Sequence, residues 1–230
     1  MRTIKQIRLL MAALTLTVIS TSTYASVILD NNIGPINRRS GPFGADSTAG
    51  GEAFETFGQV FTAPITGVLS SFTLSLKGGV GALYGGVGVW DSANRKSPAS
   101  LYQSASVLSP GPAFIDIPAD APFDAPNTPF TFHPGVSVIA GQQYIAYLSV
   151  FGDPAADRYA LVYGSDDVVT GIGRFFALND AAPNDPTQIW ARGQTLLFNA
   201  VFEEVPEPGT LALLGAGLIG LGGLRRRLRA

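Results

Sequence analysis

The side chains that could carry hydrolytic or metal chemistry are few in this sequence. The 230 residues include one histidine, His133, and no cysteine. A Ser-His-Asp hydrolase would have to use His133, and the Gly-x-Ser-x-Gly pattern of a nucleophile elbow does not occur. Thiol catalysis, iron–sulfur clusters and cysteine-based zinc sites are excluded. Because Pro134 and Gly135 follow His133, we predict a solvated turn residue there.

Carboxylates leave two further kinds of chemistry open. A glycosidase needs only two acids on either side of a cleft, and they can come from distant strands, so a secreted polysaccharide-active hydrolase is the alternative function. Calcium needs several oxygen ligands, which neighbouring loops could supply. The calcium candidates flank a predicted strand over Tyr159–Tyr163; they are Asp153, Asp157, Asp166 and Asp167. Asn31, Asn32 and the acids of 180–185 could serve equally well as ligands. Solvated turns explain all of these residues, so we expect no cofactor.

The two tryptophans are the candidates for sugar recognition. An exposed indole can stack on the apolar face of a pyranose while nearby amides or carboxylates bond its hydroxyls. Trp90 is followed by Asp91 and Asn94, and Trp190 lies between Gln188 and Arg192. Tryptophan is more often a core residue, so two interpretations stand for each: a stacking platform or part of the core.

Charge narrows the class of partner. Of the 15 Lys and Arg residues, three lie near the N-terminus and four near the C-terminus, which leaves eight in residues 26–205 against sixteen of the 17 Asp and Glu. No basic surface of the kind that neutralises phosphates is available, so we expect no nucleic-acid binding. The acidic balance suits a secreted, soluble surface.

The elements that would position these side chains are strands. Val68, Phe72, Leu74 and Leu76 alternate with largely polar residues, which predicts a strand with one buried face. Tyr144–Phe151 is apolar on both faces, as in the centre of a sheet. Further strands are predicted over Phe54–Phe61, Val87–Trp90, Leu101–Val107, Phe114–Ile117, Tyr159–Tyr163, Arg174–Leu178 and Thr195–Phe202. With turn residues between them and no helical periodicity, the pattern predicts an all-β, antiparallel two-sheet sandwich with a jelly-roll-like topology.

The N-terminal residues 1–25 differ from this core. Arg2, Lys5 and Arg8 precede an apolar run, Leu9–Ile19, and the small-x-small pattern Thr23-Tyr24-Ala25 follows. These are the three parts of a secretory signal peptide, so we expect a signal helix that signal peptidase removes between Ala25 and Ser26.

The C-terminal residues 206–230 have three parts of their own. Pro206, Glu207 and Pro208 are followed by Gly209–Leu224, which has no charge, and then by Arg225, Arg226, Arg227 and Arg229. Prolines stop the preceding strand, and the sixteen apolar residues would span about 24 Å as one transmembrane helix. The arginines would stay cytoplasmic by the positive-inside rule, so the domain would lie beyond the inner membrane.

This tail resembles the PEP-CTERM sorting signal. The resemblance implies a protein of a Gram-negative bacterium that makes extracellular polysaccharide. It also implies processing by exosortase, a membrane protease-transpeptidase, after a transient stay in the inner membrane. The mature protein would then lie at the cell surface or outside the cell.

A second resemblance concerns the core. Residues 59–76 and 139–148 are similar to secreted β-sandwich domains often found before such tails, some of which are compared with carbohydrate-binding modules. The sequence therefore divides into three predicted parts: a signal peptide at 1–25, a β-sandwich at 26–205 and a sorting tail at 206–230. We expect a non-enzymatic envelope or matrix protein associated with exopolysaccharide or the cell surface.

Overall fold

The computed structural model of the chain describes residues 25–31, 38–44, 54–78, 80–109, 128–152, 159–165, 169–178, 182–193 and 195–205. Ser26–Glu204 form one compact unit, described here by itself. The predicted signal helix, the strand at Phe114–Ile117 and the tail from Pro206 lie outside the described residues. Within those residues every regular element is a strand, and no helix is long and apolar enough to cross a membrane.

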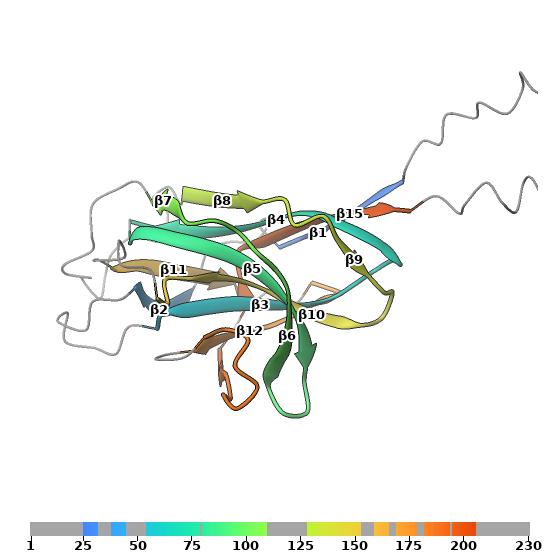
Figure 1. Cartoon of the computed structure of the whole chain (residues 1–230). Coiled ribbons are helices and arrows are strands. Elements are labelled where there is room, and N and C mark those ends of the chain that lie inside the picture. The colour runs from blue at the N-terminus through green and yellow to red at the C-terminus, as the bar shows by residue number, and fades with distance from the viewer. Residues whose placement is uncertain are drawn as a thin grey trace, which may run out of the picture. The chain divides into compact units, whose positions relative to one another are not determined.

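Two antiparallel sheets make up the unit, which confirms the predicted all-β class (Figure 1). The first sheet has the order β1-β15-β4-β11-β14, with β2 paired to β11 and both β8 and β9 paired to β4. Its strands are β1 (Ser26–Asp30), β2 (Arg38–Gly44), β4 (Gly67–Lys77), β8 (Thr128–Phe132), β9 (Val136–Val138), β11 (Tyr159–Ser165), β14 (Thr195–Leu196) and β15 (Phe198–Glu204).

The second sheet has the order β13-β12-β3-β10-β5-β6, and β7 pairs with β5. Its strands are β3 (Thr56–Thr62), β5 (Gly81–Asp91), β6 (Lys96–Gln103), β7 (Val107–Ser109), β10 (Gln143–Ser149), β12 (Ile172–Leu178) and β13 (Ala191–Arg192). Strands β3 to β5 and β9 to β12 alternate between the sheets along the chain, as strands of a jelly roll do, although the jelly-roll topology itself stays a prediction.

Strand β4 corrects one detail of the predicted alternation. Phe72, Leu74 and Leu76 are buried as predicted, but Leu69 is buried and Val68 only half-buried. The cause is a β-bulge: Val201 of β15 pairs with Ser71 while Phe202 pairs with Leu69, so one residue of β4 is left over. An extra residue exchanges the two faces of a strand, which moves Leu69 to the core side.

Strand β10 has the place that its two apolar faces predicted. It pairs with β3 on one side and β5 on the other. Tyr144, Ala146 and Leu148 belong to the main core, whereas Ile145 and Tyr147 belong to a second buried cluster on the opposite face. The second sheet is therefore covered on both of its faces.

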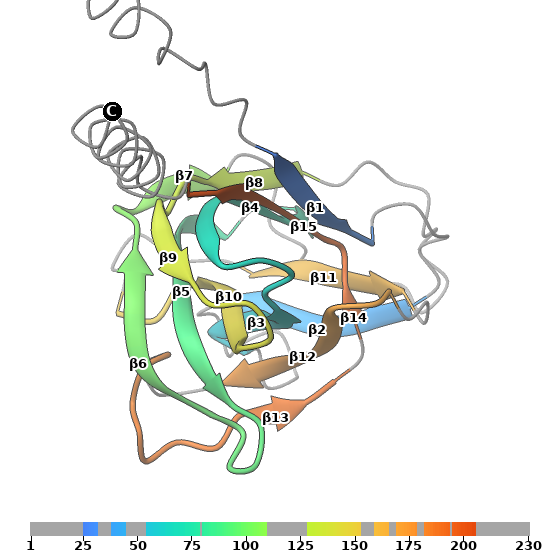
Figure 2. The ribbon, with the colours of Figure 1, turned by 90° about the vertical axis from the view of Figure 1, so that its right-hand side faces the viewer.

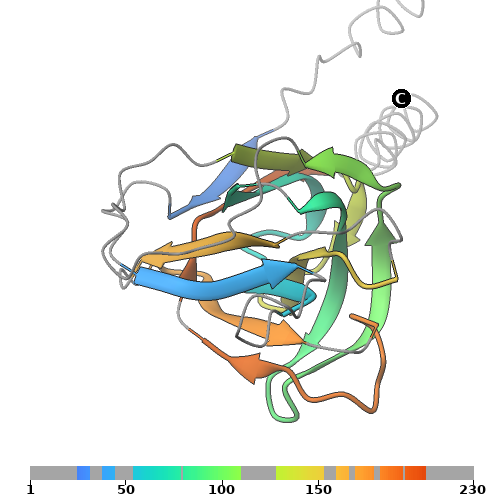
Figure 3. The ribbon, with the colours of Figure 1, turned by 90° about the vertical axis from the view of Figure 1, so that its left-hand side faces the viewer.

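We call these two clusters the inner core and the outer cluster. The inner core lies between the sheets and includes Phe61, whose ring packs against those of Tyr144, Phe198 and Phe202 at centroid distances of 5.6 to 5.8 Å. The outer cluster comprises Val60, Tyr84, Trp90, Ile145, Tyr147, Phe176, Leu178 and Trp190. The β5–β6 hairpin and the segment leading into β13 lie side by side at this end of the domain (Figures 2 and 3).

Candidate functional site

A cleft of about 320 Å³ opens beside the outer cluster. Its apolar lining is Val60, Trp90 and Phe176, its cationic lining is Arg95, Arg174 and Arg192, and its neutral polar lining is Ser92, Gln143 and Gly173. Strands β3, β5, β10, β12 and β13 contribute to it, together with the β5–β6 turn. All of these elements belong to the second sheet or its hairpin.

Aromatic packing forms the apolar part of the cleft. The rings of Trp90 and Phe176 have centroids 4.5 Å apart, and Trp190 meets Trp90 edge-on at 6.0 Å. Trp90 and Phe176 are only 6% and 8% exposed, and Trp190 is fully buried. Tyr147 lies against Trp190 with the centroids 6.2 Å apart, and burial raises the pKa of Tyr147 to about 12. The aromatic rings therefore pack mainly against each other, and only small parts of Trp90 and Phe176 reach the surface of the cleft.

This burial distinguishes the two tryptophans that the sequence singled out. Trp190 has no free ring face, so it packs as a core residue and offers no stacking platform. Its indole Nε1 has no hydrogen-bond partner among the described atoms. Trp90 is a core residue too, but part of it still lines the cleft.

The β5–β6 turn places Arg95 at the cleft. The Asp91 carboxylate accepts hydrogen bonds from the backbone N–H of Ala93 and Asn94, at 3.0 and 3.1 Å, and from Asn94 Nδ2 at 2.7 Å. Asn94, first through its side chain and then through its backbone, lowers the pKa of Asp91. Arg95 follows with φ of 53°, the one non-glycine residue of the described chain with positive φ.

The segment before β13 is tied to that turn. The backbone N–H of Trp190 donates to the Arg95 carbonyl at 3.0 Å, and Lys96 Nζ donates to the Pro186 carbonyl at 2.9 Å. The segment is also ordered internally, since Asp185 accepts from the Thr187 hydroxyl and backbone N–H, which lower the pKa of Asp185. These hydrogen bonds fix the segment before β13 against the β5–β6 turn.

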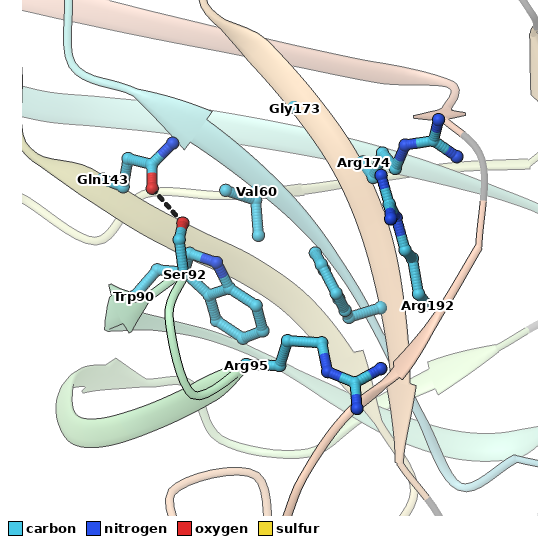
Figure 4. A pocket seen from close by; sticks show the side chains of 9 residues that line it. Val60, Trp90, Ser92, Arg95, Gln143, Gly173, Arg174 and Arg192 are labelled. Carbon is cyan, nitrogen blue, oxygen red and sulfur yellow. Dashed lines mark hydrogen bonds between the residues drawn. The ribbon is translucent and has the colours of Figure 1, made fainter.

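Strand geometry brings Arg174 and Arg192 to the same face. Arg174 and Phe176 are two residues apart on β12, so their side chains point to one side of the sheet. Arg192 of β13 pairs directly with Phe176 and therefore shares that side. Figure 4 shows the three arginine side chains along one part of the cleft and the Ser92–Gln143 pair, joined by a hydrogen bond, across from them.

The lining has a definite chemical character. The described residues that line the cleft include three cations and no carboxylate, so this lining suits an anion and supplies no acid pair of a glycosidase. Elsewhere in the described part of the chain, no group of three His, Asp or Glu residues could hold a metal ion. The calcium candidates Asp153, Asp157, Asp166 and Asp167 lie outside the described residues.

Two other polar residues have structural roles. His133 is exposed in the turn between β8 and β9, as predicted. Asn31, an alternative calcium ligand by sequence, is buried: its Oδ1 accepts from the Phe198 N–H at 2.6 Å and its Nδ2 donates to the Leu196 carbonyl. Its amide is thus occupied in holding β14 and β15.

Sequence reasoning missed Arg95 and Arg174 as site residues and noted Arg192 only as a neighbour of Trp190. A signal existed in β12, where Arg174 precedes Phe175 and Phe176 in a predicted strand. The pairing of β12 with β13, which completes the group, has no sequence signature because β13 has only two residues.

Comparison with known protein families assigns the C-terminal tail. Residues 204–227 match the family described as PEP-CTERM protein-sorting motif. The match includes Pro206, Glu207 and Pro208, as well as Arg225, Arg226 and Arg227, and it confirms the resemblance of the tail. Comparisons with curated proteins and with solved structures gave no match. The chain is therefore a PEP-CTERM domain-containing protein, with the sorting motif at residues 204–227.

Proposed function

We propose that this chain is a non-enzymatic protein of the cell surface or extracellular matrix that binds exopolysaccharide through the cleft beside the outer cluster. The sorting motif supports an exported protein processed by an exosortase-type enzyme. Signal peptidase would act first, between Ala25 and Ser26. The tail would then hold the precursor in the inner membrane with the β-domain in the periplasm.

The composition of the cleft is the observation that carries the binding proposal. A sugar site needs apolar surface for the pyranose ring and a few fixed polar groups. The cleft provides the first through Val60, Trp90 and Phe176, and the second through its arginines and Gln143. No carboxylate is among the described residues that line it, which favours binding over the alternative, a hydrolase with paired acids.

The experiment compares two bulky variants of the full-length chain in a pull-down with the host's own exopolysaccharide. Ser92→Phe places a ring at the cleft, whereas Ser137→Phe places the same ring on β9 of the first sheet, and both serines are exposed. We expect Ser92→Phe to lose most of the binding and Ser137→Phe to keep it. Equal binding by both variants would remove the cleft from the proposal. Release of new reducing ends from the polysaccharide would favour the hydrolase.

Sorting has its own test. Deletion of 206–230 should release the protein without processing, because the apolar run is the segment proposed to anchor the protein in the membrane. Replacing Arg225, Arg226, Arg227 and Arg229 with Ser should weaken orientation while the apolar run stays. Fractionation of the envelope, with the size of the product on a gel, checks both. A tail-less chain that still fractionates with the inner membrane would place the anchor elsewhere.

A further inference from the structure

We propose that the cleft binds an acidic sugar residue, a uronate, with its carboxylate held by Arg95, Arg174 and Arg192 and its ring against the apolar lining. This inference rests on the proposed function and names the class of sugar. Four features of the structure lead to it.

The first feature is a contrast of charge. Residues 26–205 hold twice as many acids as bases, yet three of the eight bases line this one cleft. Among the described residues that line it there is no acid, so positive charge is concentrated here against the balance of the whole domain. With twice as many acids as bases, the whole domain repels an anion at long range, so attraction for one has to come from this local concentration of arginines.

The second feature is that no described residue neutralises the charge of these three arginines. None of the three guanidinium groups forms an ion pair with another residue in the described ranges, and all three residues are exposed. The like charges of the arginines around one opening repel each other, and a bound anion would offset that repulsion by attracting all three. Guanidinium groups also match the planar fork of a carboxylate, which an ammonium does not.

The third feature is backbone strain at the cleft. A left-handed conformation is unfavourable for a residue with a Cβ, and Arg95 adopts it. The Asp91 hydrogen bonds on one side and the Trp190 N–H on the other hold it there. Residues in such conformations gather at ligand sites, where the surrounding structure fixes a side chain in place for its ligand.

The fourth feature separates a sugar acid from a simple anion. Phosphate or sulfate alone has no apolar face, whereas part of Trp90, with Val60 and Phe176, lines the same cleft as the arginines. The volume of about 320 Å³ lies at the small end of the range for small-molecule sites, which fits one or two sugar residues rather than a long groove.

The test titrates the full-length chain, in mild detergent, with oligomers of galacturonate, glucuronate and mannuronate, and with their methyl esters. The ester keeps the ring and removes the negative charge. We expect at least one acid to bind about tenfold or more tightly than its ester, since hydrogen bonds to charged groups are worth that much. Raising the salt concentration should lower the affinity for the acid and leave the affinity for the ester unchanged.

Variants assign the binding to the cleft. The double variant Arg174→Gln with Arg192→Gln should lose about tenfold or more in affinity without a change in melting temperature, because both side chains are exposed. Arg192→Lys keeps the charge without the fork, and an intermediate loss is expected. The control is the double variant Arg38→Gln with Arg39→Gln, on β2 of the first sheet, which makes the same change of charge. It should bind the acidic oligomer as tightly as the natural chain does.

The possible adverse outcomes distinguish the uronate inference from the proposed function. Equal affinity for acid and ester, or for the cleft and control variants, overturns the uronate inference and leaves exopolysaccharide binding in place. Competition by inorganic phosphate at the same concentration as the oligomer makes the cleft a simple anion site and also overturns it. Uronate binding without binding of the host's polysaccharide supports the inference and overturns the proposed function. No binding of any acid or polysaccharide overturns both.

Discussion

The inner core and the outer cluster are both rich in aromatic residues, but they are closed in different ways. The inner core lies between two sheets, and strands from both contribute to it. The outer cluster lies on the far face of the second sheet, and it is closed by the β5–β6 turn and the segment before β13, joined by the bonds from Trp190 and Lys96. The inner core is thus covered by a whole sheet, whereas the outer cluster is covered by a turn and a short segment that a few hydrogen bonds join.

The difference explains where the cleft lies. A sheet laid over a sheet leaves close-packed side chains and no opening, as protein interiors generally do. A turn and a short segment cover only part of a face, so the edge of the outer cluster stays accessible and carries charged side chains. Stability is therefore expected to depend most on the inner core, and ligand binding on the outer cluster. Four predictions probe this division, beginning with the largest effect.

Phe61→Ala in the inner core should have the largest effect. Phe61 is fully buried among three other rings, and its removal leaves a cavity that two sheets cannot easily close. We expect a loss of about 4 kcal/mol in the free energy of unfolding. That corresponds to a fall of about 8–16 °C in melting temperature for a domain of this size. Thermal melts followed by far-UV circular dichroism measure it, and a fall below about 4 °C would contradict the close packing of the inner core.

Trp190→Ala should come second, with a loss of about 3 kcal/mol. The segment above Trp190 can settle into the space more easily than a sheet can, which reduces the cavity. Trp190→Phe is the matched control: it keeps most of the apolar volume and removes an Nε1 that has no partner among the described atoms, so we expect a loss of about 1 kcal/mol or less. Urea titrations of the two variants measure both losses. Equal losses would contradict the expectation that the lost apolar volume sets the cost.

The sequence predicted the inner core better than the outer cluster, and the reason is periodicity. β4 alternates because its two faces meet different surroundings, whereas β10 is apolar throughout because both of its faces are buried. Both strands are present as predicted apart from their ends. The bulge that moves Leu69 inward depends on the pairing with β15, which no local pattern encodes. β2, with the sequence RRSGPFG, lacks the apolar residues that mark a strand and was missed.

The cleft was harder to predict because its residues come from separate elements. Arg95 lies in a turn, Arg174 on β12 and Arg192 on β13, and only the pairing of Phe176 with Arg192 brings the last two together. Trp190 lies outside any strand, so no alternation could tell whether its ring faces solvent or core. Sequence identified the tryptophans as important and left their role open, and burial supplies the answer.

Gln59→Met tests the polar tie between the two sheets, with a smaller loss. Gln59 on β3 is buried; its Nε2 donates to the Val60 and Gly173 carbonyls, and its Oε1 accepts from the Leu196 N–H at 2.8 Å. Methionine preserves the size and leaves that N–H without an acceptor, which should cost about 2 kcal/mol. Amide hydrogen exchange should show the loss of protection at Leu196 in β14. Unchanged exchange there would show that the bond contributes little.

Arg95→Asn should have the smallest effect on stability and the opposite sign. Asparagine is enriched in the left-handed conformation that Arg95 adopts, so this variant should gain about 0.5–1 kcal/mol. Arg95→Ala removes the same guanidinium but keeps the strain, and we expect no such gain from it. If the outer cluster is the binding region, both variants should lose affinity for the acidic oligomer to a similar extent while only Arg95→Asn melts higher, by about 1–4 °C. Paired melts and titrations separate strain from charge in this way. An Arg95→Asn variant that melts lower than Arg95→Ala would show that the turn does not strain its backbone, and Arg95 would then serve the cleft through its charge alone.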